Sequence, residues 1–267
     1  MSKIQDQLYQ KTALITGAAS GIGYELARIF AHDKYNLVLV DINYLKLTEI
    51  TGDFQEKFDI SVKIISKDLS KSNSPEEIFT ELQKEGIQVD VLVNNVGFGT
   101  YGLFNETNLN DELEMLQVNL VCLTHLTKLF LKNMVKQGDG KILNVASSAA
   151  FQPGPLMAVY FATKAYVLSF SEALANELQG TGVTVTVMCP GTTQSAFHER
   201  TGMADSELIK KKNMMDAETV ARIGYNALMK GKTIVIPGIL NKILAKIVRF
   251  IPRSLVTKIV RKMQENN

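Results

Sequence analysis

The chain has 267 residues, of which 46% are hydrophobic and 21% charged, as in an ordinary globular protein. It has no run of about 20 uncharged apolar residues, and its polar start, MSKIQDQLYQ, lacks the apolar core of a signal peptide, so we expect a cytoplasmic protein without a transmembrane helix. The formal net charge is only +2, but nine basic residues and one acid follow position 229, which indicates a mildly acidic body with a basic tail.

Short β-branched runs alternate with longer helical patterns along the body of the chain. The predicted strands cover residues 12–16, 36–41, 62–68, 89–95, 140–147, 183–189 and 232–238. Several of them are apolar almost throughout, which is typical of strands covered on both faces. The helical patterns between them predict parallel crossovers, and no linker or repeat divides the chain. We therefore predict a single α/β domain, a doubly wound parallel sheet of about seven strands with helices on both faces.

The segment TALITGAASGIGYELARIF passes from the first predicted strand to a helix through Gly17, Gly21 and Gly23. Glycines allow a tight turn and a close approach of the backbone to a pyrophosphate, whose charge is favoured by the free N–H groups at the helix start. A plain tight turn is the alternative. The position between a strand and an apolar-periodic helix favours a dinucleotide site.

The second predicted strand ends at Asp41, eighteen residues after Gly23. An acid at this place can accept hydrogen bonds from the hydroxyls of an adenosine ribose, and it repels a 2′-phosphate. Ile42 and Asn43 follow, and no Arg or Lys stands beside the acid, so NAD(H) is favoured and NADP(H) is the alternative. A second interpretation, compatible with the first, is that Asp41 caps the helix beginning near Tyr44.

Six motifs in order resemble those of the short-chain dehydrogenase/reductase family, over about residues 10–238. They are TGAASGIG (16–23), KDL (67–69), NNVG (94–97), QVNLV around Asn119, YFATK (160–164) with Ser147 thirteen residues before it, and CPGTTQS (189–195). NNVGFGTYGLF and the basic tail resemble the ketoreductase-type branch, which acts on hydrophobic carbonyls. Many members of that branch use NADP(H) with an Arg after the second strand, and this sequence departs from them at Asp41.

The resemblance implies a Rossmann-type fold and a hydride transfer between NAD(H) and a hydrophobic secondary alcohol or ketone. Tyr160 would exchange a proton with the substrate oxygen, and Ser147 would hydrogen-bond that oxygen. Lys164 would hold the nicotinamide ribose, and Asn119 would hold a water that passes protons from Lys164 to solvent. The implied cofactor-binding residues are Gly17, Ser20, Gly21, Ile22, Gly23, Asp41, Asp68, Leu69, Asn95, Gly97, Tyr160, Lys164, Pro190, Gly191, Thr193 and Ser195.

Tyr160 and Lys164 are four residues apart, so on a helix their side chains project from the same face. A tyrosine with an ordinary pKa of about 10 is a poor base at neutral pH, and a neighbouring ammonium favours the phenolate. We therefore expect Lys164, with the positive nicotinamide of the oxidised cofactor, to lower the pKa of Tyr160. The choice of Ser147 over Ser148 rests on spacing, because successive strand residues point to opposite faces.

Two alternative functions stay open, the same chemistry with NADP(H) and a dinucleotide-binding regulator without turnover. The complete set of four catalytic residues argues against the regulator, which needs no acid–base pair. The family analogy favours a homodimer or homotetramer. The three histidines share no metal-ligand spacing, and Cys122 and Cys189, in apolar segments, are predicted to be buried thiols.

Residues 239–267 repeat apolar pairs about every four residues, with Lys and Arg on the other face and a break near Pro252. The pattern predicts two short amphipathic helices, an extension of a catalytic domain 1–238 and not a separate domain. Their apolar face either packs on the body or a second subunit, or lies on an anionic membrane surface. A nucleic-acid role is not expected, because the segment has one aromatic residue and no recognition module.

Overall fold

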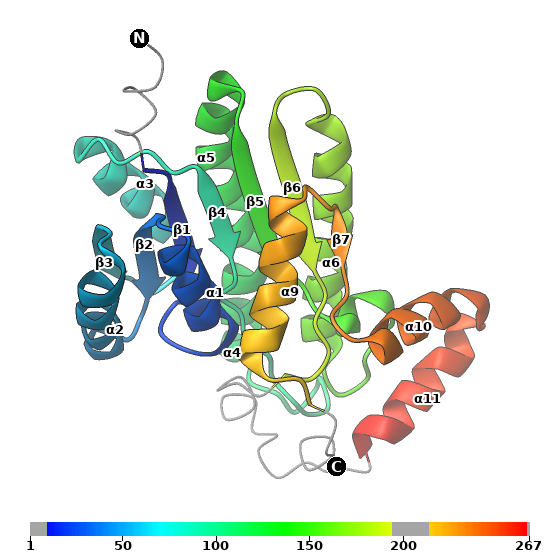
Figure 1. Ribbon diagram of the computed structural model, residues 1–267. Helices are drawn as coiled ribbons and strands as arrows, with labels where there is room; N and C mark the ends of the chain where they lie inside the picture. The colour runs from blue at the N-terminus through cyan, green and yellow to red at the C-terminus, as the bar shows by residue number, and fades with distance from the viewer. Residues whose placement is uncertain (1–9, 194–213, 266–267) are drawn as a thin grey trace.

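A computed structural model describes residues 10–193 and 214–265, and the seven strands in these ranges form one parallel sheet (Figure 1). The strands are β1 Thr12–Thr16, β2 Asn36–Asp41, β3 Val62–Ser66, β4 Val91–Asn94, β5 Gly140–Val145, β6 Val183–Met188 and β7 Ile234–Val235. Their order across the sheet is β3-β2-β1-β4-β5-β6-β7. The predicted doubly wound sheet is therefore confirmed, although β3 to β7 are shorter than expected.

Helices cover both faces of the sheet. They are α1 Gly21–His32, α2 Tyr44–Phe58, α3 Ser74–Lys84, α4 Leu109–Leu116, α5 Leu123–Gln137, α6 Ala158–Glu177 and α9 Ala217–Met229. A π-helical turn, Gln117–Cys122, joins α4 to α5, and a 3-10 turn, Ser148–Phe151, follows β5. One face is packed by α1, α2 and α9, and the other by α3, α5 and α6 (Figure 1).

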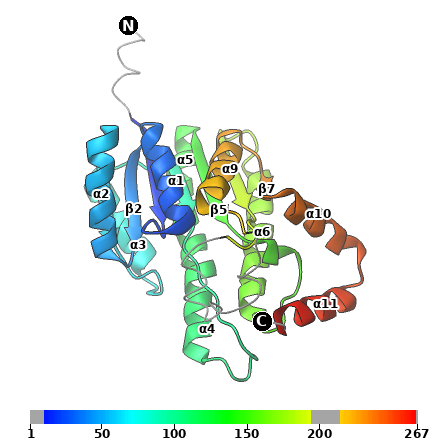
Figure 2. The same ribbon diagram turned by 60° about the horizontal axis from the view of Figure 1, so that its bottom comes forward.

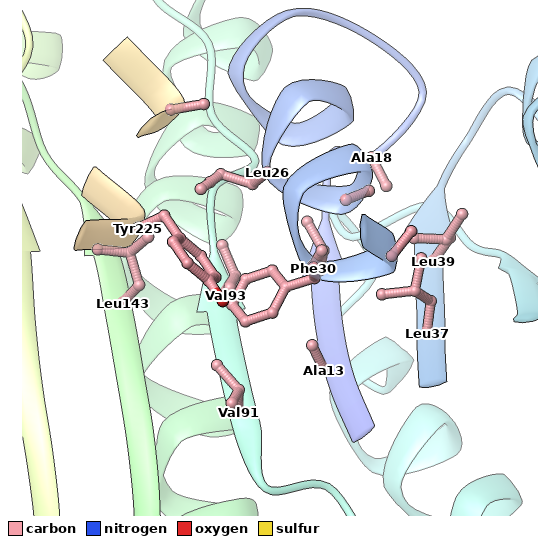
Figure 3. Close-up of a cluster of buried hydrophobic side chains, with 14 of the residues drawn as sticks. Ala13, Ala18, Leu26, Phe30, Leu37, Leu39, Val91, Val93, Leu143 and Tyr225 are labelled. Carbon is pink, nitrogen blue, oxygen red and sulfur yellow. The ribbon is translucent and has the colours of Figure 1, made fainter. Parts of the chain in front are cut away.

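Each face of the sheet has its own hydrophobic cluster. Ala13 and Ile15 of β1 belong to the cluster under α1, α2 and α9, whereas Leu14 between them belongs to the one under α3, α5 and α6. In the first cluster the fully buried ring of Phe30 meets that of Tyr225 edge to face, with 4.9 Å between the ring centroids (Figure 3). This packing fixes α1 and α9 against the strands.

A network of buried polar side chains crosses the second face near the carboxyl ends of β4 and β5. The Asn94 amide donates to the Thr127 hydroxyl at 3.0 Å and to the Asn144 side chain at 2.9 Å. The Asn144 amide donates in turn to the Ser171 hydroxyl at 2.9 Å. Asn94 and Asn144 are also partners in the register of β4 and β5. The network therefore ties two strands to α5 and α6 directly behind the edge where the loops begin.

A crevice forms where the strand order reverses. β1 lies between β2 and β4, and the chain leaving β1 continues into α1 on one face, whereas the chain leaving β4 continues through α4 to α5 on the other. In open parallel sheets, ligands bind at this point, outside the carboxyl ends of the strands. The glycine loop after β1 opens directly onto it.

Two further helices, α10 Ile239–Ile247 and α11 Arg253–Glu265, follow β7, separated by a 3-10 turn at Val248–Phe250 and by Pro252. They are the two helices that the tail pattern predicts. In both views they lie beyond β7, at the opposite end of the molecule from α2 and α3 (Figure 1, Figure 2). Val256 and Val260 of α11 are buried in a cluster with Met115 and Tyr160. Across the described residues, no helix has the length and apolar character needed to cross a bilayer.

Replacing Phe30 with Ala is expected to lower the free energy of unfolding by about 3–5 kcal/mol, because it removes a fully buried ring and leaves a cavity. Leu45→Ala is the matched control, since Leu45 on α2 is 80% exposed and its loss should change stability by less than about 0.5 kcal/mol. Chemical unfolding followed by circular dichroism measures both. Equal losses in the two variants would contradict the assignment of the core.

Candidate active site

A cavity of about 900 Å³ lies at this crevice, along the carboxyl ends of the strands. Its wall contains most of the residues that the sequence indicated, namely Gly17, Ser20, Gly21, Ile22, Asp41, Asp68, Leu69, Asn95, Gly97, Ser147, Tyr160, Lys164, Pro190, Gly191 and Thr193. Gly23 and Asn119 support the wall from behind, against Gly17 and Phe98 respectively. Ser195 lies outside the described residues.

Close backbone contacts shape the glycine loop. Gly17 has a φ of +67°, in the left-handed region that favours glycine. A Cβ on Gly23 would lie 2.1 Å from the carbonyl oxygen of Gly17, so glycine alone lets α1 approach the loop this closely. The Asn95 amide donates to the carbonyl oxygens of Thr16 and Gly17 at 2.9 and 3.2 Å. The loop is thus held from β4 and leaves the start of α1, at Gly21, on the cavity wall, where its N–H groups suit a pyrophosphate.

Asp41 ends β2 on the wall of the same cavity. Its carboxylate oxygens accept the backbone N–H groups of Ala19 at 3.1 Å and Asn43 at 3.0 Å. The side chain of Asn43 caps α2 by accepting the N–H of Lys46. The interpretation of Asp41 as the helix cap is therefore wrong. A carboxylate oxygen has two lone pairs, so both oxygens retain the capacity to accept a ribose hydroxyl.

Two lysines that sequence reasoning did not connect with a cofactor also line the cavity, Lys46 on α2 and Lys67 after β3. The backbone N–H of Lys67 donates to the carbonyl oxygen of Asp41 at 3.0 Å, so the two residues are neighbours. Each ammonium is paired with a glutamate at 2.8 Å, Lys46 with Glu49 and Lys67 with Glu77. The parallel pairing of β2 with β3 is the signal that could have placed Lys67 beside Asp41.

Asp68 and Leu69 follow β3 in a tight turn. The Asp68 carboxylate accepts the backbone N–H of Ser70 at 2.9 Å, and hydrogen bonds from Ser70 hold the pKa of Asp68 below its usual value. The Asp68 carbonyl oxygen accepts the hydroxyl of Ser74 at 2.6 Å, at the start of α3. Leu69 is buried. The turn therefore presents both residues to the cavity in a fixed conformation.

Ser147 follows the end of β5, and Tyr160 and Lys164 lie on the first two turns of α6. Ser147 acts on the Tyr160 phenol and lowers its pKa, which favours Ser147 over Ser148 as the partner of the tyrosine. The Lys164 ammonium donates to the carbonyl oxygen of Val145 at 3.0 Å and lies 5.7 Å from the centre of the Tyr160 ring. Hydroxyl, phenol and ammonium thus meet at one place.

Burial controls the protonation of this group, because removal from water disfavours the charged form of each side chain. It raises the pKa of Tyr160 to about 12, and Ser147 opposes this only in part. It lowers the pKa of Lys164 to about 8, with Cys189 acting in the opposite direction. In the protein by itself the pKa of Tyr160 is therefore raised and not lowered, because burial outweighs the effect expected from Lys164. At pH 7 Tyr160 is a neutral phenol and Lys164 an ammonium.

Asn119 occupies the π-helical turn between α4 and α5, a kind of distortion that is frequent at functional sites. Its side-chain oxygen accepts the backbone N–H of Phe98 at 3.2 Å. Its side-chain nitrogen donates to the backbone carbonyl oxygen of Phe98 at 2.9 Å and to the Thr163 hydroxyl at 3.2 Å. A Cβ on Gly97 would lie 3.1 Å from the Asn119 oxygen and 3.3 Å from the Lys164 nitrogen. Asn119 thus holds the loop after β4 against α6, beside Lys164.

The loop after β6 closes another side of the cavity. The Pro190 carbonyl oxygen accepts the N–H of Ser148 at 2.7 Å, and the Thr193 hydroxyl donates to the Gly191 carbonyl oxygen at 3.0 Å. A Cβ on Gly191 would lie 2.5 Å from the side-chain nitrogen of Asn241 on α10. The loop is therefore in contact with the chain after β5 on one side and with the tail on the other.

Gln264, near the end of α11, is a cavity residue that sequence reasoning missed. It is buried and lines the cavity, and its side-chain oxygen has no hydrogen-bond partner among the described residues. The Tyr101 hydroxyl donates instead to the backbone carbonyl oxygen of Gln264, at 2.8 Å. Apolar residues that line the same cavity are Phe98, Val118, Met157 and Phe161. No sequence signal linked Gln264 to them, because it stands 100 residues beyond Lys164 and follows no motif.

The remaining reactive side chains do not add to the site. Cys122 and Cys189 are free, buried thiols, as predicted, and burial raises the pKa of each to about 12. Within the described ranges there is no group of His, Cys, Asp and Glu that could hold a metal ion. The chemistry of the cavity therefore centres on Ser147, Tyr160 and Lys164.

Comparison with known proteins agrees with this geometry. The family model for short chain dehydrogenase matches residues 11–205. A diacetyl reductase, (S)-acetoin forming, from Staphylococcus epidermidis is 34% identical over 201 residues, which are 75% of this chain and 77% of that protein. The solved structure of a short-chain dehydrogenase from Sphingobium yanoikuyae in complex with NADPH is 25% identical with a TM-score of 0.80, covering 91% of this chain and 97% of that one.

A second solved structure, the bulky-bulky ketone specific alcohol dehydrogenase from Comamonas testosteroni, is 26% identical with a TM-score of 0.76, covering 91% of this chain and 96% of that one. The family model covers well over half of the chain, and the motifs it implies meet in one cavity. The chain therefore belongs to the short-chain dehydrogenase family, the NAD(P)-dependent oxidoreductases that act on CH–OH groups.

Proposed function

We propose that the protein transfers a hydride between NAD(H) and a hydrophobic secondary alcohol or ketone, with Tyr160 as general acid and base. The observation that carries the proposal is that Tyr160, Ser147 and the Lys164 ammonium line one cavity together with the glycine loop. A bound NAD(H) would supply or accept the hydride, and the chain handles the proton.

In the direction of carbonyl reduction, the Tyr160 hydroxyl donates its proton to the substrate oxygen, and the Ser147 hydroxyl donates a hydrogen bond to the same oxygen. With a pKa of about 12, Tyr160 carries this proton throughout the neutral range. The Lys164 ammonium stabilises the phenolate that remains, since an opposite charge at this range favours the charged form. Asn119 positions the loop beside Lys164, and we retain for it the role of holding a water that returns protons from solvent.

The preference for NAD(H) is supported by Asp41, whose carboxylate would meet the adenosine ribose and repel a 2′-phosphate. NADP(H) is the second candidate, and a specific observation favours it. Lys46 and Lys67 line the same cavity and could pair with a phosphate. Both are already paired with a carboxylate, Lys46 with Glu49 and Lys67 with Glu77, which supports NAD(H) as the first choice.

The apolar cavity wall supports a hydrophobic substrate. Phe98, Met157 and Phe161 offer no hydrogen bond from their side chains, and the bulky ketone specificity named for the Comamonas testosteroni relative points in the same direction. Further parts of the proposal are a catalytic domain 1–238 with an extension 239–267, a homodimer or homotetramer, and a cytoplasmic location with peripheral membrane contact through the tail.

Tyr160→Phe is expected to lower kcat by about 100-fold or more, because general acid–base catalysis contributes about 10²–10⁴-fold. The Kd for NADH, measured by fluorescence titration, should change by less than about twofold, since the ring remains in the cavity wall. Tyr166→Phe on the same helix is the control, because the Tyr166 hydroxyl bonds to Thr124 and lies outside the cavity wall. Turnover near the wild-type rate in Tyr160→Phe would remove the mechanism. Absence of turnover in the wild type over a broad ketone screen would favour the regulator.

Asp41→Ala is expected to raise the Kd for NADH about tenfold, because hydrogen bonds to a charged group contribute about 1.5–3 kcal/mol, and to lower the Kd for NADPH. Lys46→Ala and Lys67→Ala test the opposite preference and should leave the Kd for NADH unchanged. Direct binding titrations measure the Kd for NADH and for NADPH in the wild type and in the three variants. A wild type that binds NADPH more tightly, with binding lost in the lysine variants, would overturn the Asp41 argument.

Lys164→Met is expected to raise the free energy of unfolding at pH 7 by about 1–3 kcal/mol while abolishing turnover, because it removes an ammonium whose pKa is lowered by burial. Burial lowers the pKa from 10.5 to about 8, so between these values the unfolded chain binds more protons than the folded one. The wild type should therefore gain stability as the pH rises through this window, and the advantage of the variant should shrink.

Chemical unfolding at several pH values between about 7 and about 10.5 measures the difference between wild type and variant. Lys128→Met on the exposed side of α5 is the control, and its effect on stability should stay small. A Lys164→Met protein less stable than the wild type at pH 7 would contradict the cost assigned to this buried charge.

A further inference from the structure

Helix α10 turns its apolar side away from the rest of the protein. Ala245 is the one buried residue of this fully described helix, and Asn241, one turn earlier, contacts Gly191 of the body. The opposite side of the helix is apolar and 46–77% exposed, and it consists of Ile239, Leu240, Ile243, Leu244 and Ile247. A surface helix of a globular protein normally directs such a stripe toward the core. The orientation of α10 is therefore reversed.

Helix α11 also exposes apolar side chains. Its buried side consists of Val256, Val260 and Gln264. The residue before each of these is apolar and exposed. The exposed apolar residues of α11 and the turn before it are Phe250, Leu255, Ile259 and Met263. Together with the five exposed residues of α10 they form what we call the tail surface. A monomer seldom exposes so many large apolar side chains in one short stretch of chain.

Basic side chains border the tail surface. Residues 239–265 contain seven Lys and Arg residues and one acid, Glu265, whose side chain pairs with Arg261. On the circumference of α10, Lys242 and Lys246 stand next to the apolar stripe, between it and the side that faces the body. Residues 1–229, in contrast, contain more acids than bases. The positive charge of the protein is thus concentrated around the tail surface.

We propose that the tail surface docks on an anionic lipid bilayer, with α10 and α11 lying in the plane of the headgroups. An apolar stripe bordered by Lys and Arg is the pattern of helices that lie at the boundary between headgroups and acyl chains. The basic residues add attraction to anionic lipids. A second copy of the chain fits less well, because a two-fold contact through this surface would bring seven basic residues against seven others.

The docked helix also belongs to the cavity. Gln264 on the inner side of α11 lines the cavity, and the hydrogen bond from Tyr101 ties the end of α11 to the loop after β4. One helix, about 10–12 Å across, would therefore separate the bilayer from the cavity wall. This arrangement does not rest on the proposed hydride transfer, because it concerns only the surface and its lipid.

The full-length protein, sedimented with liposomes, tests the proposal. It is expected to bind liposomes of phosphatidylcholine with phosphatidylglycerol, and not liposomes of phosphatidylcholine alone. Raising the salt from about 0.1 M to about 1 M should weaken binding about tenfold or more, because it screens the basic residues. The triple variant Ile239→Ser, Ile243→Ser, Ile247→Ser and the double variant Lys242→Glu, Lys246→Glu should each weaken binding by about tenfold or more.

The double variant Lys128→Glu, Lys132→Glu is the matched control, since it makes the same charge change on exposed positions of α5 and should bind as the wild type does. Unchanged NADH binding and circular dichroism show that each variant is folded, and they keep this test separate from that of the enzyme activity. A wild type that never sediments with the anionic liposomes, or tail variants that bind as tightly as the wild type, would overturn the proposal. A triple variant with an altered oligomeric mass but unchanged liposome binding would also overturn the proposal, and it would assign the surface to contact with a second copy of the chain.

Discussion

The common direction of all seven strands is the constraint on which the site depends. Because every strand ends at the same edge, residues that follow separate strands meet there, such as Gly17 after β1, Asn95 after β4 and Ser147 after β5. A parallel sheet needs helices over both faces to cover its apolar strands. The two hydrophobic clusters are therefore what allows glycine, amide and hydroxyl groups to share one cavity, and they offset the unfavourable burial of Lys164.

Patterns that are local in the sequence predicted most of this arrangement. A strand, three glycines and a helix are consecutive, and Tyr160 and Lys164 share a helical face, so short spacings describe them. The features that were missed depend on the folded environment. Lys67 reaches Asp41 only through the pairing of β2 with β3, and the protonation of Tyr160 depends on burial, which no spacing reveals. With two polar candidates at one helix start, the sequence could not show that Asn43 is the cap of α2.

The tail also shows what a sequence pattern cannot predict. Apolar pairs every four residues predict helices wherever they occur, but they do not say which member of a pair faces the protein. In α11 the pair Leu255 and Val256 is divided, with Leu255 exposed and Val256 buried. In α10 both members of the pair Ile243 and Leu244 face outward. Packing on the body therefore buries one member of each apolar pair in α11 and almost none of the apolar side chains of α10. The sequence pattern is the same in both helices, so only the tertiary contacts show this difference.

The buried polar network has a consequence for how the sequence can change over generations. Asn94, Asn144, Thr127 and Ser171 are hydrogen-bonded to one another across two strands and two helices. Removing one takes a hydrogen bond from its buried neighbour, at a cost of about 1–3 kcal/mol, whereas replacing bonded partners together with apolar groups of similar shape can be nearly neutral. Descendants of this sequence are therefore expected to keep all four residues or to exchange them as a set, while exposed helix positions drift one at a time.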